Sequence, residues 1–270
     1  MNATSNISEE MSAQKRFTAL VTLGESQRIS AFEIAREIGR IWPSQRNSIR
    51  ASVRDDDGAL LLYIDGVVVV VVFFDQPASE DAISLSNGPD PVWPEAKEAL
   101  APQRAHALVT TLDSFTKPKE AFSCALAMTL VGISLVHLLE SAIGLHWIGA
   151  GVGIPASRAK ELGVELARGV IPTELWLRLY LIHGGDDSSV GAMTKGLIPF
   201  AGREIEIDPV RMKPRDVSAR AVSLSNYLLQ NGPVLKDGET AGVTGQEKFR
   251  IHLVNSARVR GLPVFHLMLE

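Results

Sequence analysis

Hydrophobic positions at the start of the chain form one short run and one helical stripe. Residues 17–24 are an apolar run that ends in glycine, which predicts a strand. Residues 30–42 carry apolar side chains at helical spacing. Ser30 and Glu33 stand as a capping box at the start of this segment, and Pro43 follows as a stop. The pattern therefore predicts a strand followed by a helix.

The next segment contains six consecutive valines, Val67 to Val72, followed by two phenylalanines. Asp57-Gly58 and Asp65-Gly66 divide the segment into extended pieces, and Asp-Gly between apolar runs predicts a hairpin. We therefore expect a β-meander with the valine run as its third strand. The run is far shorter than the roughly 20 residues of a membrane helix. Because it does not alternate, we expect a central strand that is covered on both faces.

Helical and extended patterns interleave through the rest of the chain. Predicted helices cover residues 94–101, 121–139, 157–168 and 216–230. Predicted strands cover residues 104–113, 145–152, 173–185, 247–256 and 262–270, with a broken hairpin over 193–208. Since hairpins are frequent, the pattern predicts an α+β fold with mixed, largely antiparallel sheets and packed helices.

The uncharged segment 121–139 is long enough to span a membrane. It contains Ser, Thr, Gly, Cys and His137, and it lacks the usual basic anchors. A buried core helix is therefore the favoured interpretation, and membrane attachment through this segment is the alternative.

The chain is expected to divide into a flexible tail over residues 1–16, an N-terminal α+β lobe over 17–103 and a C-terminal α+β lobe over 104–270. Each lobe begins with a strand followed by a helix, which is the pattern of two related α/β lobes. No sequence repeat relates the two halves.

Composition and charge narrow the class of protein. The chain of 270 residues is 46% hydrophobic and 21% charged, which is typical of a globular protein. The formal net charge of −4 argues against a nucleic-acid-binding surface. Cys124 is the only cysteine, so no internal disulfide can form, and its apolar surroundings indicate a buried, unreactive thiol. We expect a cytoplasmic protein.

One predicted strand carries a row of carboxylates. Glu204, Glu206 and Asp208 alternate with Arg203, Ile205 and Ile207, so the three acidic side chains share one face. Carboxylates at this spacing could activate water, or could bind a metal with help from another strand. An exposed polar face over an apolar inner face is the ordinary alternative.

Other candidate positions lie in turns and strands. Asp237 and Thr240 flank a tight turn, and Asp186 and Asp187 follow a strand, where binding groups often lie. The histidines are scattered, and no H-x-x-x-H pair is present. Residues 149–154 resemble a dinucleotide loop but lack its third glycine. We therefore expect no cofactor and no resident metal.

Four segments together resemble the DUF4261 family, a bacterial domain family of unknown function. They are "YIDGVVVVVVFFDQP", "VWPEAKEALAPQRAHALVTTLD", "TKGLIPFAGREIEID" and "SNYLLQNGPVLKDGETAG". The segment "ASEDAISLSNGPDP" departs from the family pattern. The resemblance implies a bacterial cytoplasmic α+β protein, with some members encoded near type VI secretion genes. It supplies no established catalytic residues, and the matching polar positions are His106, Glu204, Glu206, Asp237 and Thr240.

Two functions are compatible with these features. The first is a non-catalytic protein-interaction module, an immunity or accessory protein whose partner would be another protein, such as a secreted effector. The alternative is a hydrolase or metal-dependent enzyme that uses Glu204, Glu206 and Asp237 with His106. The absence of a catalytic constellation favours the first, with no nucleic-acid or membrane partner and the oligomeric state left open.

Overall fold

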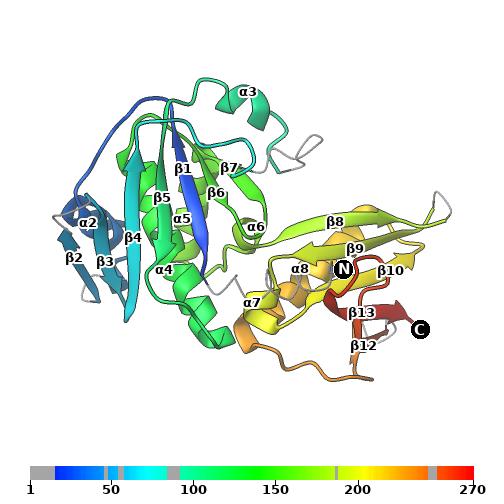
Figure 1. The fold of residues 1–270 in the computed structure, drawn as a ribbon. Coiled ribbons are helices and arrows are strands. Elements are labelled where there is room, and N and C mark those ends of the chain that lie inside the picture. Colours follow the sequence, from blue (N-terminus) through cyan, green and yellow to red (C-terminus); the bar gives the residue numbers. More distant parts are fainter. Residues whose placement is uncertain (1–15, 46–47, 54–57, 84–91, 186–187, 243–247) are drawn as a thin grey trace, which may run out of the picture. The chain divides into compact units, whose positions relative to one another are not determined.

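The computed structural model describes residues 16–45, 48–53, 58–83, 92–185, 188–242 and 248–270 (Figure 1). The described residues form two compact units. The first unit comprises residues 16–115 and 123–176, and the second comprises 116–122 and 177–270. Each unit contains one sheet in which antiparallel pairing predominates, so the predicted α+β class is confirmed.

The first unit is built on a seven-stranded sheet of order β2-β3-β4-β5-β1-β6-β7, in which all neighbours are antiparallel. Its strands are β1 (Thr18–Leu23), β2 (Ile49–Val53), β3 (Leu60–Ile64), β4 (Val67–Phe74), β5 (Ala105–Thr111), β6 (Ala142–Trp147) and β7 (Val152–Pro155). Strands β2, β3 and β4 are the predicted meander. The turn between β3 and β4 has positive φ at both Asp65 and Gly66, as a two-residue hairpin requires.

The valine strand β4 lies third in the sheet, so the prediction of an interior strand is confirmed. The prediction that both faces are covered was only partly correct. Val69 and Val71 are fully buried, whereas Val68, Val70 and Val72 are only half-buried. Six identical side chains carry no alternation, and the pattern could not reveal that the two faces differ.

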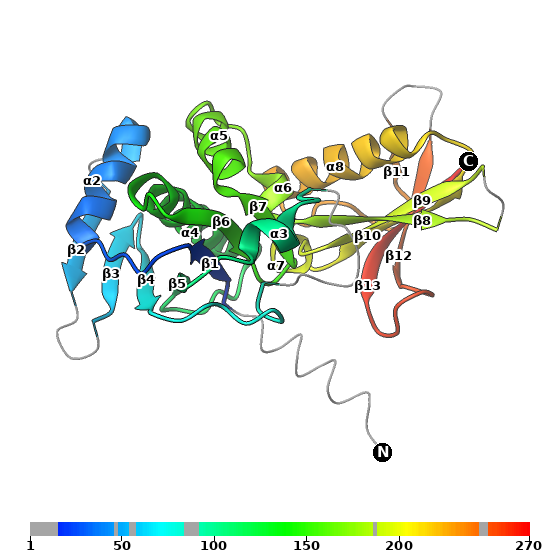
Figure 2. The same ribbon diagram turned by 90° about the horizontal axis from the view of Figure 1, so that it is seen from above.

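Helices α2 (Ala31–Ile41), α4 (Pro118–Leu138) and α5 (Ala156–Ala167) lie on the same side of this sheet (Figure 2). Small residues allow close packing here: a Cβ added at Gly132 would lie 3.0 Å from Leu145 of β6, and one added at Gly163 would lie 2.9 Å from Ile133. The predicted capping box at the start of α2 is present, with Ser30 and Glu33 bonded reciprocally.

A second hydrophobic cluster lies on another part of the first unit. It joins Leu20 to Trp93, Ala96 and Leu100, around the short helix α3 (Ala96–Leu100). The short helices η1 (Pro43–Gln45) and α6 (Thr173–Trp176) complete the described elements of this unit.

Helix α4 is long and apolar enough to cross a membrane by length and composition alone, and it is the one such helix among the described residues. In its most apolar window, 72% of the residues are buried inside the protein. Core helices of globular proteins have the same length and composition. Cys124 lies on this helix and is buried, as predicted.

The second unit is built on a six-stranded sheet of order β11-β12-β13-β10-β9-β8. Its strands are β8 (Arg178–His183), β9 (Val190–Lys195), β10 (Glu204–Val210), β11 (Thr240–Ala241), β12 (Phe249–Asn255) and β13 (Pro263–Leu269). Strands β10 and β13 are parallel, and the other neighbours are antiparallel. Helix α8 (Pro214–Asn231) packs on β8, β9 and β10, and the short helix α7 (Ile198–Ala201) connects β9 to β10.

The two units divide the chain differently from the expected lobes. Strands β5, β6 and β7 follow residue 103 but pair in the first sheet, and the second sheet begins only at β8. Pairing between β1 and β5 joins residues that are far apart in sequence, which local patterns do not encode.

Candidate functional site

Five side chains, each from a different strand, form a row across one face of the second sheet. The strand register aligns Tyr180 of β8 with Met193 of β9, Glu206 of β10, His266 of β13 and His252 of β12. Because successive side chains alternate between faces, these five share one face. Helix α8 packs on β8, β9 and β10 through the buried apolar residues of the opposite face, which include Ala192 and Ile207. We call the face that carries Glu206 the open face.

Glu206 is a buried acidic group of the open face. Its side chain is only 3% exposed, and its Oε1 lies 3.2 Å from Nε of Arg258, in the connection between β12 and β13. Its Oε2 is buried and has no hydrogen-bond partner among the described residues. A buried carboxylate oxygen without a partner is costly, so a group bound at this position would stabilise the folded protein.

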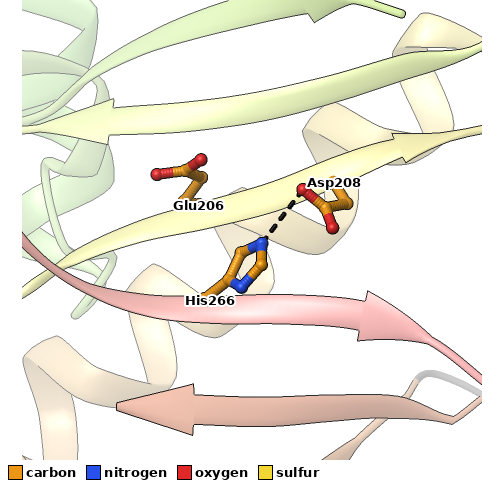
Figure 3. Close-up of side chains that lie close together, drawn as sticks. All are labelled: Glu206, Asp208 and His266. Atoms are coloured by element: carbon orange, nitrogen blue, oxygen red, sulfur yellow. Dashed lines mark ion pairs between the residues drawn. The ribbon is translucent and has the colours of Figure 1, made fainter. Parts of the chain in front are cut away.

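Asp208 and His266 lie next to Glu206 (Figure 3). Asp208 Oδ1 lies 2.9 Å from Nε2 of His266, and both side chains are partly exposed. One donor atom from each of the three residues lies within 4.8 Å of the other two. The parallel pairing of β10 and β13 brings these groups together, since Glu206 and His266 are register partners. A carboxylate that holds an imidazole beside a second carboxylate can bind a cation or transfer protons.

Glu204 has a structural role in the loop that precedes β10. Its carboxylate accepts hydrogen bonds from Thr194 Oγ1 and from the backbone N–H groups of Gly196, Leu197 and Ile198, at 2.7–3.2 Å. These bonds hold the turn into α7 and use both carboxylate oxygens. Glu204 therefore belongs to the framework of the loop.

Asp237 lies on the same unit but outside the cluster of Glu206, Asp208 and His266. Its Oδ1 accepts a hydrogen bond of 2.8 Å from the backbone N–H of Leu253 and lies 3.9 Å from Nδ1 of His252. The side chain is 67% exposed. Asp237 therefore fixes the 237–240 turn against β12.

Thr240 is exposed at the start of β11 and lines an open pocket of about 760 Å³. Arg220, Tyr227 and Arg250 line the same pocket. Both arginines already donate to carbonyl oxygens, Arg220 to Asp216 and Arg250 to Gly238. Asp186 and Asp187, the other predicted binding residues, lie outside the described residues.

His106 lies on β5, in the first sheet. Its Nδ1 is 2.8 Å from the carbonyl oxygen of Gln76, and its ring stacks on Phe74 with a centroid distance of 4.8 Å. The predicted grouping of Glu204, Glu206, Asp237 and His106 is therefore replaced by the cluster of Glu206, Asp208 and His266. Sequence reasoning missed His266 and Arg258, because no spacing signal pairs either residue with β10.

The fold and this cluster define an α+β protein with two carboxylates and a histidine gathered on an open sheet face. Residues 193–267 match the model of DUF4261, a domain of unknown function, which confirms the family resemblance over this segment. The matched segment runs from β9 into β13 and contains Glu206, Asp208, Arg258 and His266. No curated protein and no solved structure matches the chain.

Proposed function

We propose that the protein is an interaction module that binds another protein through strand β8. The observation that carries the proposal is the character of this strand, which forms one edge of the second sheet. Its sequence, RLYLIH, has no proline, glycine or lysine, and Tyr180 and Leu181 are each 43% exposed. An exposed apolar edge strand offers unpaired backbone groups that can pair with a strand of a partner.

The other sheet edges carry features that discourage such pairing. Strand β11 has only two residues. Strand β7 has four residues, with Gly153 and Pro155 among them, and β2 has five residues. Strands β2 and β8 each carry one arginine, Arg50 and Arg178. Short strands, proline and charged side chains are the usual means of protecting an edge. Strand β8, with six residues and no proline, is the longest of these edge strands and is therefore the one best suited to β-strand addition.

The open face carries further exposed side chains, on strands β12 and β13 at the other side of the sheet from β8. Val254 and Met268 are 41% and 44% exposed on this face, beside His252 and Arg258. Aromatic residues, methionine and arginine are enriched at protein interfaces. The resemblance to DUF4261 suggests the partner: a secreted effector, with the protein as its cytoplasmic immunity or accessory protein.

The test is binding to the products of adjacent genes, measured with purified proteins. We expect one of these products to bind, and the variant Tyr180→Lys to lose that binding because it places a charge on the edge strand. Tyr227→Lys is the matched control, since Tyr227, on α8, is exposed to a similar extent. Failure of every adjacent product to bind, or equal binding by Tyr180→Lys, would count against the proposal.

Hydrolysis is a second candidate function, favoured by the pair Asp208–His266. A carboxylate that orients an imidazole makes it an effective general base, and Glu206 lies beside the pair. Turnover of ester and phosphodiester substrates by the wild type, abolished in His266→Gln, would support this function. Equal turnover by the variant would exclude it.

A further inference from the structure

We propose that Glu206, Asp208 and His266 bind one divalent metal ion of the zinc or manganese type. This proposal is separate from the proposed binding of a partner protein, because a metal ion would contact only these three side chains and not strand β8. It assigns a ligand to a cluster for which neither the family nor the sequence motifs supply one.

The buried carboxylate of Glu206 is the first observation. Its side chain is 3% exposed and its Oε2 has no partner among the described residues, although Arg258 pairs with Oε1. Leaving a charged oxygen buried without a partner costs free energy that a bound cation would offset. Oε2 can ligate a metal ion while Oε1 keeps its ion pair with Arg258.

The geometry of the three donors is the second observation. The donor atoms lie within 4.8 Å of one another, and Asp208 Oδ1 is 2.9 Å from Nε2 of His266. Metal–oxygen and metal–nitrogen bonds of about 2.0–2.2 Å require ligand atoms no more than roughly 4.4 Å apart. Small side-chain rotations would bring any longer separation within this limit. Asp208 and His266 are partly exposed and can make them.

Charge also favours a cation. Glu206 and Asp208 contribute two negative charges, and Arg258 contributes one positive charge, so these groups retain one negative charge when His266 is neutral. The side chain of Arg258 is 39% exposed and belongs to the β12–β13 connection, so it can shift when a metal binds.

The donor set indicates the kind of metal. Imidazole nitrogen with carboxylate oxygens suits zinc and manganese, whereas magnesium and calcium prefer oxygen ligands alone. Three protein ligands leave at least one coordination position for water or for a ligand of the metal. The site would therefore be of the open kind, accessible from the open face.

The test is calorimetric titration of the full chain, stripped with EDTA, with zinc chloride and with manganese chloride. We expect one ion to bind per chain. Affinity should fall by more than about tenfold in Glu206→Gln, Asp208→Asn and His266→Gln, since loss of even an outer partner commonly costs 10–100-fold. His252→Gln and Asp237→Asn are matched controls, because they alter a second His–Asp pair in the same unit, and they should retain binding.

Three results would overturn the proposal: no binding by the wild type at millimolar metal, unchanged affinity in the three variants, or equal loss in the two controls. Far-UV circular dichroism checks the fold of each variant. Should Glu206→Gln unfold, Asp208→Asn and His266→Gln decide the question, because both side chains are partly exposed. Absorption of the cobalt-loaded wild type, altered in His266→Gln, would show directly that imidazole is a ligand.

Discussion

His146 is a buried histidine of the first sheet. Its surroundings offer few groups that could stabilise a protonated imidazole. Its Nε2 lies 3.3 Å from Oγ1 of Thr22, and its Nδ1 has no partner among the described residues. Burial lowers the pKa of His146 from 6.5 to about 4. The unfolded chain therefore binds a proton between these pH values while the folded protein does not, so stability falls as the pH falls through this window.

The predicted size of this effect follows from the shift in pKa. Between pH 7 and pH 5, His146 should cost the folded protein about 2 kcal/mol. Urea unfolding of the wild type and of His146→Gln at both pH values measures it. The difference in stability between the two proteins should change by that amount, since the other titrating groups are common to both. A difference independent of pH would contradict the assignment.

The sequence correctly placed Glu204 on strand β10, but its carboxylate holds the preceding loop and does not join the cluster of Glu206, Asp208 and His266. Its carboxylate accepts from Thr194 and from the backbone of the loop that leads into α7. Glu204→Ala should destabilise the protein by about 3 kcal/mol, because buried N–H groups lose their acceptor. Urea unfolding provides the measurement.

Glu161→Ala is the matched control for this prediction. Glu161 is a 67% exposed carboxylate paired with Arg158, and its loss should cost no more than about 1 kcal/mol. Similar losses in the two variants would show that Glu204 is not the anchor of the loop.

At the scale of elements, the β3–β4 turn offers a test of backbone conformation. Gly66 has φ +83°, and an added Cβ would meet no atom within 4 Å. Gly66→Ala should therefore cost about 1–2 kcal/mol through the left-handed backbone alone. Gly149→Ala is the control, since Gly149 has equal space and lies outside the positive-φ region, and it should be nearly neutral. Equal stability of the two variants in urea would contradict this reasoning.

Elements that are determined by a few neighbouring residues were predicted correctly from the sequence. The capping box of α2, the Asp65-Gly66 turn and helix α8 agree with the structure. The predicted strand over residues 173–185 was only partly correct, because its first residues form α6. Four residues of helix are too short to show a helical period, so the apolar run resembled the start of a strand.

The candidate site was predictable only in part, because it depends on how strands β10 and β13 pair. Alternation placed Glu206 and Asp208 on one face of β10, as observed. His266 joins them because β13 lies parallel to β10 in one particular register. A register between distant strands depends on the packed sheet and leaves no spacing signal in the chain.

At the scale of the whole molecule, the two units should respond separately to a metal ion. A ligand that binds only the folded state stabilises it by about 2.7 kcal/mol at 100 times its Kd. The proposed ligands Glu206, Asp208 and His266 all belong to the second unit. Hydrogen exchange in the presence of zinc should therefore slow in β9, β10 and β13, whereas β1 and β5 of the first unit should exchange as before.

His266→Gln provides the control for this experiment, because it should abolish the zinc-dependent protection and leave exchange in the first unit unaltered. Equal protection of both units would indicate that they unfold as one cooperative body, since a ligand then stabilises the whole body. Protection confined to the first unit would place the metal away from Glu206. Protection confined to the strands that carry Glu206 and His266 would show that a metal bound at this cluster stabilises the second unit alone.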